Sequence, residues 1–128
     1  MKKKVLIADD DANTVELLKT LLGQCDCEIF TAKNGSETFN VCRKEKPHIV
    51  ILDIMMPHFS GYQVLQRLKK SEEFKPHPLV LILSAKSQPE DIKQAEMLGC
   101  DAYLVKPFEP QELINKVEDL LNTKKYTL

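Results

Sequence analysis

The chain has 128 residues, of which 43% are hydrophobic, so it is long enough to form one domain with a sizeable buried core. Its 18 lysines and arginines nearly balance 19 aspartates and glutamates, and the net charge of -1 gives no overall attraction for nucleic acid or an acidic membrane. These values exclude a disordered chain and a small disulfide scaffold, and they argue against a second full domain.

The predicted elements alternate between strand and helix along the whole chain, because short apolar runs alternate with segments of helical periodicity. The apolar runs predict five strands, in chain order Val5–Ala8, Glu28–Ala32, Ile49–Leu52, Leu79–Leu83 and Ala102–Val105. Helical periodicity predicts five helices, in chain order Val15–Leu22 with its stop at Gly23, Ser36–Glu45, Gly61–Lys70, Glu90–Leu98 and Pro110–Leu121.

Five strands that alternate with five helices predict an α/β fold, with a parallel sheet and helices on both of its faces. Parallel strands need crossover connections, and strands that are apolar throughout need cover on both sides. We assign residues 1–123 to this domain and residues 124–128 to a short C-terminal tail.

Polar residues follow four of the five predicted strands. Three aspartates, 9 to 11, come directly after the first strand, Asp53 follows the third, Ser84 the fourth and Lys106 the fifth. In open α/β sheets, ligands bind outside the carboxyl ends of the strands at the point where strand order reverses. We therefore expect these side chains to line one pocket, provided that the first strand is central.

Three carboxylates at close range repel one another, and a divalent cation would relieve that repulsion. An oxygen-only ligand set without histidine or thiolate favours Mg²⁺, which typically shares its coordination with water and phosphate. A carboxylate can also accept a phosphoryl group itself as an aspartyl-phosphate, while Mg²⁺ and a lysine neutralise the charge on the oxygens. Asp53, alone after the middle strand, is the best candidate for that acceptor.

With these residues, nearly the whole chain resembles the CheY-like receiver domain of two-component response regulators. The matching motifs are, in chain order, the acidic pair Asp9-Asp10, the phosphoacceptor loop with Asp53, Met56-Pro57 and Gly61, the switch serine with its small neighbour at Ser84-Ala85, the aromatic switch Tyr103, and Lys106-Pro107-Phe108.

The resemblance implies a flavodoxin-like strand order, 2-1-3-4-5, and a role in a phosphorelay. A sensor histidine kinase or a histidine phosphotransfer protein would transfer a phosphoryl group from its phosphohistidine to Asp53. The resemblance further implies Mg²⁺ held by Asp10, Asp53 and the backbone carbonyl of Met55, with Asp9 acting chiefly through water. It also implies a cis peptide bond between Lys106 and Pro107.

After phosphorylation, Lys106 and the hydroxyl of Ser84 would bind the new phosphoryl oxygens. Movement of Ser84 would make room for Tyr103 and shift the surface of the fourth helix, fifth strand and fifth helix between inactive and active states. We expect that surface to bind an output domain or a downstream protein. The chain would be a monomer, or a dimer that phosphorylation promotes through the same surface.

Two positions that influence the lifetime of the phosphorylated form in this family are occupied here by Met55 and Lys86. Neither side chain is a carboxylate or an amide that could orient an attacking water, so we expect slow self-dephosphorylation. The chain would then be a regulatory phosphoacceptor rather than an enzyme, with only self-phosphorylation and self-dephosphorylation activity. We expect no direct binding of nucleic acid.

Three other functions are compatible with parts of the sequence. A phosphohydrolase that resembles the haloacid dehalogenases would also form an aspartyl-phosphate, but it needs a second aspartate where Met55 stands. A nucleotide- or flavin-binding module would have a glycine-rich loop after the first strand, where this chain has acids. A receiver-like interaction module that is never phosphorylated is disfavoured by the intact Asp53, Ser84 and Lys106.

Some of these residues also have simpler structural explanations. Asp11 is expected to cap the helix that follows it, since an aspartate before a helix accepts from unpaired backbone N–H groups. Asp53 could form an Asx turn before Pro57, and Tyr103 could pack outside the sheet. Only the combination of motifs favours the functional interpretation.

Membrane insertion and export are not indicated. The longest apolar runs span four or five residues, whereas a membrane-spanning helix needs about twenty, and the run behind the N-terminal lysines is shorter than the roughly 7–15 residues of a signal-peptide core. We therefore expect a cytoplasmic protein with no membrane partner. The four cysteines are interpreted as reduced thiols, because Cys25 and Cys27 lack zinc-ligand spacing and the histidines form no paired ligand spacing.

Overall fold

The computed structural model describes residues 2–56 and 60–122. Pro57 of the expected phosphoacceptor loop and the expected tail, residues 124–128, lie outside the described residues. Within the described ranges, each of the predicted strands and helices is present, together with a short 3₁₀ helix, η1 (Glu72–Phe74), that the periodicity did not predict.

The strands form one parallel sheet in the order β2-β1-β3-β4-β5, which confirms the predicted fold class and strand order. They are, in chain order, β1 (Lys3–Ala8), β2 (Cys27–Ala32), β3 (Ile49–Leu52), β4 (Leu79–Ser84) and β5 (Ala102–Val105). Every residue of β3 and β4 is buried, because both strands lie inside the sheet and are covered on both faces.

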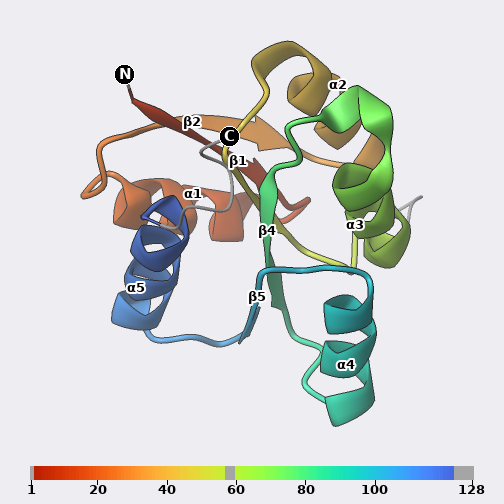
Figure 1. The fold of residues 1–128 in the computed structure, drawn as a ribbon. Coiled ribbons are helices and arrows are strands. Elements are labelled where there is room, and N and C mark those ends of the chain that lie inside the picture. The colour runs from red at the N-terminus through yellow and green to blue at the C-terminus, as the bar shows by residue number, and fades with distance from the viewer. Residues whose placement is uncertain (1, 57–59, 123–128) are drawn as a thin grey trace.

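The helices divide between the two faces of the sheet. They are, in chain order, α1 (Ala12–Leu22), α2 (Gly35–Glu45), α3 (Gly61–Lys70), α4 (Pro89–Met97) and α5 (Pro110–Leu121). Figure 1 shows α1 and α5 on one side and α2, α3 and α4 on the other, and a separate buried cluster of apolar side chains fills each side. No helix in the described part of the chain is long and apolar enough to cross a membrane.

Element ends differ from the predictions by at most three residues, mostly because backbone hydrogen bonding continues past the apolar runs. β1 already begins at Lys3, which pairs with Cys27 of β2, and β4 extends to Ser84, which pairs with Val105. Asp11 caps α1 as expected, since its side chain accepts from the backbone N–H of Asn13 at 2.9 Å.

The end of α1 departs from the expectation for a helix-terminal glycine. Gly23 has φ of -59° and ψ of -18°, so the helix closes in right-handed geometry rather than with a left-handed residue. At the end of α2 it is Lys46, not a glycine, that adopts the left-handed conformation, with φ of 49°.

Candidate functional site

Three carboxylates meet at the carboxyl end of the sheet. Asp9 and Asp10 follow β1, and Asp53 follows β3, the neighbour of β1. The backbone N–H of Asp53 donates to the carbonyl of Ala8 at 3.0 Å, which fixes the two strand ends side by side. One oxygen from each carboxylate lies within 4.8 Å of the others, although 43 positions or more separate Asp53 from the pair in the sequence.

Backbone N–H groups orient two of these carboxylates. Oδ1 of Asp9 accepts from the N–H of Asp11, and Oδ1 of Asp53 accepts from the N–H of Met55, each at 2.9 Å. Asp9 and Asp53 are buried, whereas Asp10 is exposed. The cluster therefore has fixed inner oxygens and one carboxylate that faces solvent.

Lys106, directly after β5, supplies the positive charge of the cluster. Its Nζ lies 3.0 Å from Oδ2 of Asp9 and 3.3 Å from Oδ2 of Asp53. Burial disfavours the charged ammonium, but the hydrogen bond to Asp9 and the charges of both carboxylates outweigh it and raise the pKa of Lys106. Lys106 is therefore a cation at neutral pH.

Burial acts in the opposite direction on the pKa of Asp9. Asp9 is only 3% exposed, and this burial raises the pKa of its carboxyl above the ordinary value despite the opposing hydrogen bonds from Asp11 and Lys106. The negative charge of Asp53 also raises the pKa of Asp9. One ammonium thus leaves the three carboxylates incompletely neutralised, and the site favours a further cation.

Ser84 and Tyr103 are connected through Lys86. The hydroxyl oxygen of Ser84, which is fully buried, accepts from the backbone N–H of Lys86 at 3.2 Å. The hydroxyl of Tyr103 donates to the carbonyl of Lys86 at 2.7 Å, and burial is the largest cause that raises the pKa of Tyr103 to about 12. The backbone N–H of Lys106 donates to the carbonyl of Ser84 at 2.8 Å. The connected residues Ser84, Lys86 and Tyr103 therefore adjoin the acidic cluster.

Met55 lies beside the acidic cluster with a side chain that is 55% exposed. Its backbone N–H donates to Asp53, but its side chain is a thioether and carries neither a carboxyl nor an amide group. The general acid that a phosphohydrolase of the haloacid dehalogenase type needs at this position is therefore absent.

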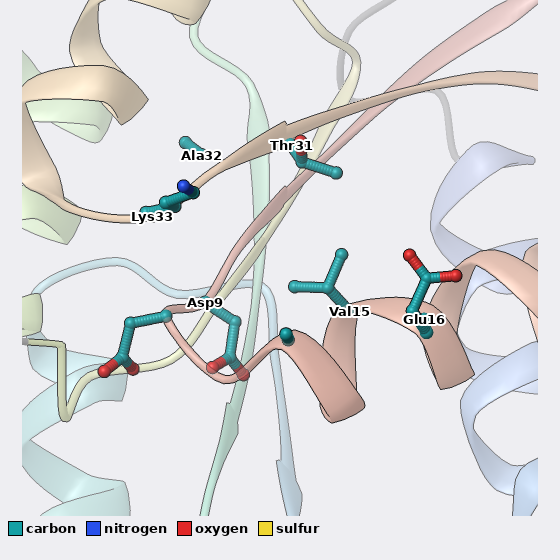
Figure 2. A pocket seen from close by; sticks show the side chains of 8 residues that line it. Asp9, Val15, Glu16, Thr31, Ala32 and Lys33 are labelled. Atoms are coloured by element: carbon teal, nitrogen blue, oxygen red, sulfur yellow. The ribbon is translucent and has the colours of Figure 1, made fainter.

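A small cavity of about 140 Å³ opens between the acidic pair and the end of β2. Figure 2 shows Thr31, Ala32 and Lys33 on one side of this cavity, facing Val15 and Glu16 of α1. Pockets for drug-sized ligands usually have roughly 300–1,000 Å³. This cavity alone lies below that range, and the acids beside it stand where a nucleotide- or flavin-binding module would have a glycine-rich loop.

Sequence reasoning missed one residue of this region. Tyr62, the second residue of α3, lies with its ring 5.7 Å from the ammonium of Lys86, and its hydroxyl donates to the carbonyl of Asp91 in α4 at 3.3 Å. Its position directly after Gly61 gave no signal, because an aromatic residue on a helix is normally part of the core.

The residues that form this site lie in a segment that matches a known family. Residues 5–118 match the response regulator receiver domain. The chain belongs to the response regulator receiver domain family.

Two curated relatives show how this receiver domain compares with longer proteins. The probable transcriptional regulator ycf27 of Pyropia yezoensis is 38% identical over 120 residues, which cover 94% of the chain and 48% of the relative. The alkaline phosphatase synthesis transcriptional regulatory protein PhoP of Bacillus subtilis (strain 168) is 34% identical over 121 residues, covering 94% and 49%. The chain spans about half the length of these relatives.

A solved structure agrees with the fold of this receiver domain. The BeF3-activated receiver domain of DrrB, a Thermotoga maritima protein, is 31% identical and superposes with a TM-score of 0.86, covering 96% of this chain and 100% of that one. The fold and the family are thus established by sequence and structure together.

Proposed function

We propose that this receiver domain accepts a phosphoryl group on Asp53 in a two-component phosphorelay. The observation that carries the proposal is the meeting of Asp9, Asp10 and Asp53 within 4.8 Å, with the ammonium of Lys106 on two of them. A charge arrangement of this kind suits the transfer of a phosphoryl group, whose oxygens need compensating positive charge.

The donor set fits Mg²⁺. Among the described residues, the cluster that could hold a metal offers only carboxylate oxygens, which hard cations prefer, and the exposed Asp10 leaves space for the waters that Mg²⁺ usually retains. Asp10, Asp53 and the carbonyl of Met55 would hold the ion, with Asp9 acting through water. When bound, Mg²⁺ supplies positive charge close to the phosphoryl oxygens.

In the proposed transfer, a carboxylate oxygen of Asp53 attacks phosphorus and forms an O–P bond, while the N–P bond of the donor phosphohistidine breaks and its imidazole leaves. Lys106 is held 3.3 Å from Asp53 and would pair with a phosphoryl oxygen as negative charge accumulates. The hydroxyl of Ser84 would donate to another phosphoryl oxygen.

The switch between states would run through Lys86. If the hydroxyl of Ser84 turns toward the phosphoryl group, it leaves the N–H of Lys86, whose carbonyl holds Tyr103 at 2.7 Å. A shift of Lys86 therefore changes the partner of Tyr103 on β5. This links the phosphoacceptor to the surface formed by α4, β5 and α5, which would be the signalling face.

The proposed partners follow from this chemistry. A sensor histidine kinase or a histidine phosphotransfer protein would supply the phosphoryl group, and an output domain or a downstream protein would bind the signalling face. The chain itself would act as a regulatory phosphoacceptor, as a monomer or as a dimer that forms through the signalling face. Its net charge of -1 favours no direct contact with nucleic acid.

Incubation with acetyl phosphate, with and without Mg²⁺, followed by intact mass measurement, tests the proposal. We expect a phosphoryl adduct that requires Mg²⁺ in the wild type and in Asp11→Asn, and no adduct in Asp53→Asn. Asp11→Asn is a matched control, because it neutralises an exposed aspartate two positions from Asp9 while asparagine keeps the helix cap. An adduct that persists in Asp53→Asn would contradict the assignment of the acceptor.

A further inference from the structure

The backbone of Tyr62 is fixed to the loop that follows Asp53. The N–H of its neighbour Gly61 donates to the carbonyl of Ile54 at 3.2 Å, and a methyl group at Gly61 would overlap the backbone of Ile54. Ile54 is itself buried, one residue after the phosphoacceptor. A displacement of Ile54 would therefore be passed to the first turn of α3.

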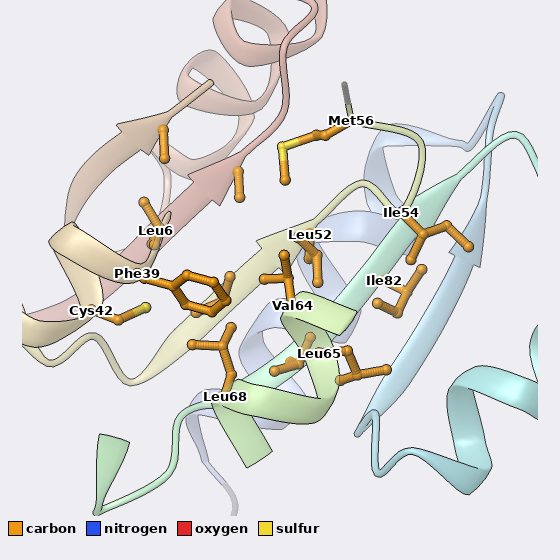
Figure 3. Close-up of a cluster of buried hydrophobic side chains, with 14 of the residues drawn as sticks. Leu6, Phe39, Cys42, Leu52, Ile54, Met56, Val64, Leu65, Leu68 and Ile82 are labelled. Atoms are coloured by element: carbon orange, nitrogen blue, oxygen red, sulfur yellow. The ribbon is translucent and has the colours of Figure 1, made fainter. Parts of the chain in front are cut away.

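The side chains on both sides of this junction share one apolar cluster. Figure 3 shows Ile54 and Met56 of the loop in the same buried cluster as Val64 and Leu65 of α3, and the ring of Tyr62 packs against that cluster. Interiors that are packed this closely transmit a shift from one element to the next rather than absorbing it.

The side chain of Tyr62 reaches α4 and the segment before it. Its hydroxyl donates to the carbonyl of Asp91 in the first turn of α4, at a distance of 3.3 Å that indicates a weak bond. The ammonium of Lys86 lies 5.7 Å from the centre of its ring, within the range of a cation–π contact. Tyr62 thus contacts both the start of α4 and the connection that joins it to β4.

Within the described part of the chain, helix α4 buries little of its own surface. Of its nine residues, only Ala95 is buried, and Met97 is 75% exposed. Gln88, at its N-terminal boundary, makes no capping hydrogen bond with its side chain. A helix that buries so little apolar surface depends strongly on each remaining contact for its position.

We propose that Tyr62 is a positioning residue that connects the loop after Asp53 to helix α4, in parallel with the connection through Ser84, Lys86 and Tyr103. The proposal rests on the proposed function for its signalling role, because the displacement that Tyr62 transmits would come from phosphorylation of Asp53. The contact of Tyr62 with α4 exists independently of that step.

The first experiment measures amide hydrogen exchange by NMR without Mg²⁺ or a phosphodonor. Tyr62→Phe keeps the ring and removes only the hydroxyl, so we expect the amides of α4 to exchange about fivefold faster, as for the loss of one hydrogen bond. The matched control is Thr20→Val, which removes a hydroxyl that donates to a helix carbonyl in α1, and it should leave α4 unchanged. Unchanged exchange in α4 of Tyr62→Phe overturns the inference and leaves the proposed function intact.

The second experiment adds Mg²⁺ and beryllofluoride, a mimic of the phosphoryl group, and compares amide chemical shifts. In the wild type, we expect changes near Asp53, in β5 and in α4. In Tyr62→Leu, which loses both the hydroxyl and the aromatic ring, the changes in α4 should fall by at least half, while those near Asp53 and Tyr103 persist.

Two results would count against the connection in this second experiment. A response of α4 in Tyr62→Leu as large as that of the wild type overturns the role of Tyr62, because the signal then needs no aromatic side chain there. A wild type that does not respond to beryllofluoride refutes the proposed function, and the coupling with it, whatever the exchange rates show. Urea unfolding of Tyr62→Leu establishes that the variant is folded before its shifts are compared.

Discussion

The ammonium of Lys106 lies 3.0 Å from Oδ2 of Asp9, which joins residues 97 positions apart at the carboxyl ends of β5 and β1. Asp9 is buried and Lys106 is largely so, hence water screens this pair less than a surface ion pair. The same ammonium contacts Asp53, and it therefore competes with any metal ion for the negative charge of the cluster.

Replacement of Lys106 by methionine should separate metal binding from phosphoryl transfer. Removal of the competing ammonium should tighten Mg²⁺ binding several-fold, whereas phosphorylation by acetyl phosphate should slow by about 100-fold because a charge that stabilises the transition state is lost. Calorimetric titration and time-resolved intact mass measure the two effects. Lys19→Met, at an exposed lysine of α1, is the control and should change neither. Weaker Mg²⁺ binding in Lys106→Met would contradict this account of the site.

Replacement of Met55 by asparagine should shorten the lifetime of the phosphorylated form. The side chain of Met55 is 55% exposed and its backbone N–H binds Asp53, so an amide at this position can orient a water toward the phosphoryl group. We expect the phosphoryl adduct to decay about tenfold faster or more. Mass spectrometry at intervals after removal of the donor measures this decay. Met55→Leu preserves the apolar character and should decay like the wild type. An unchanged or longer lifetime in Met55→Asn would show that this position does not limit hydrolysis.

Replacement of Gly61 by alanine should destabilise the fold. The added methyl group would overlap the backbone of Ile54, and neither chain segment can move away without disrupting the packing of α3. We expect the free energy of unfolding in urea to fall by about 2–3 kcal/mol. Gly23→Ala is the comparison, since Gly23 has right-handed helical angles, and its effect should stay within about 1 kcal/mol. Equal effects at the two glycines would refute the steric argument.

His48, directly before β3, should make stability depend on pH. Nδ1 of His48 accepts from the backbone N–H of Lys4 at 2.9 Å. Burial, followed by the charges of Lys3 and Lys4, lowers the pKa of His48 below its usual value of 6.5.

Because the unfolded chain binds the proton more readily, this contribution to stability is complete above the unfolded pKa and is lost as pH falls through the folded one. Urea unfolding at a series of pH values below 6.5 should show this loss in the wild type. In His48→Asn, whose amide oxygen can accept the same bond without titrating, the loss should be smaller. An equal loss in both proteins would exclude His48 as its source.

The fold class and the order of strands and helices along the chain could be predicted from the residues alone. Apolar runs such as Ile49–Leu52 are buried on both faces of the sheet. Because these runs alternate with amphipathic helices along the chain, the sequence predicts a parallel sheet with helices on both faces. Once β1 is central, the rule that strand ends collect ligands predicts that Asp9 and Asp53 lie near each other. Periodicity is a local property that the order of residues expresses directly, whereas the central position of β1 was expected from the resemblance to receiver domains.

The contacts between individual atoms of the site could not be predicted before the packed domain was known. Three contacts of the site depend on rotamers and on the placement of the helices. They are the ion pairs of Lys106 with two carboxylates, the position of Lys86 between Ser84 and Tyr103, and the hydrogen bond from Tyr62 to α4. No periodicity encodes these contacts, because each joins elements that are distant in the sequence and is selected by packing across the whole domain. Burial, which raises the pKa of Asp9 and covers the carboxylates of Asp9 and Asp53, exists only after the chain has folded.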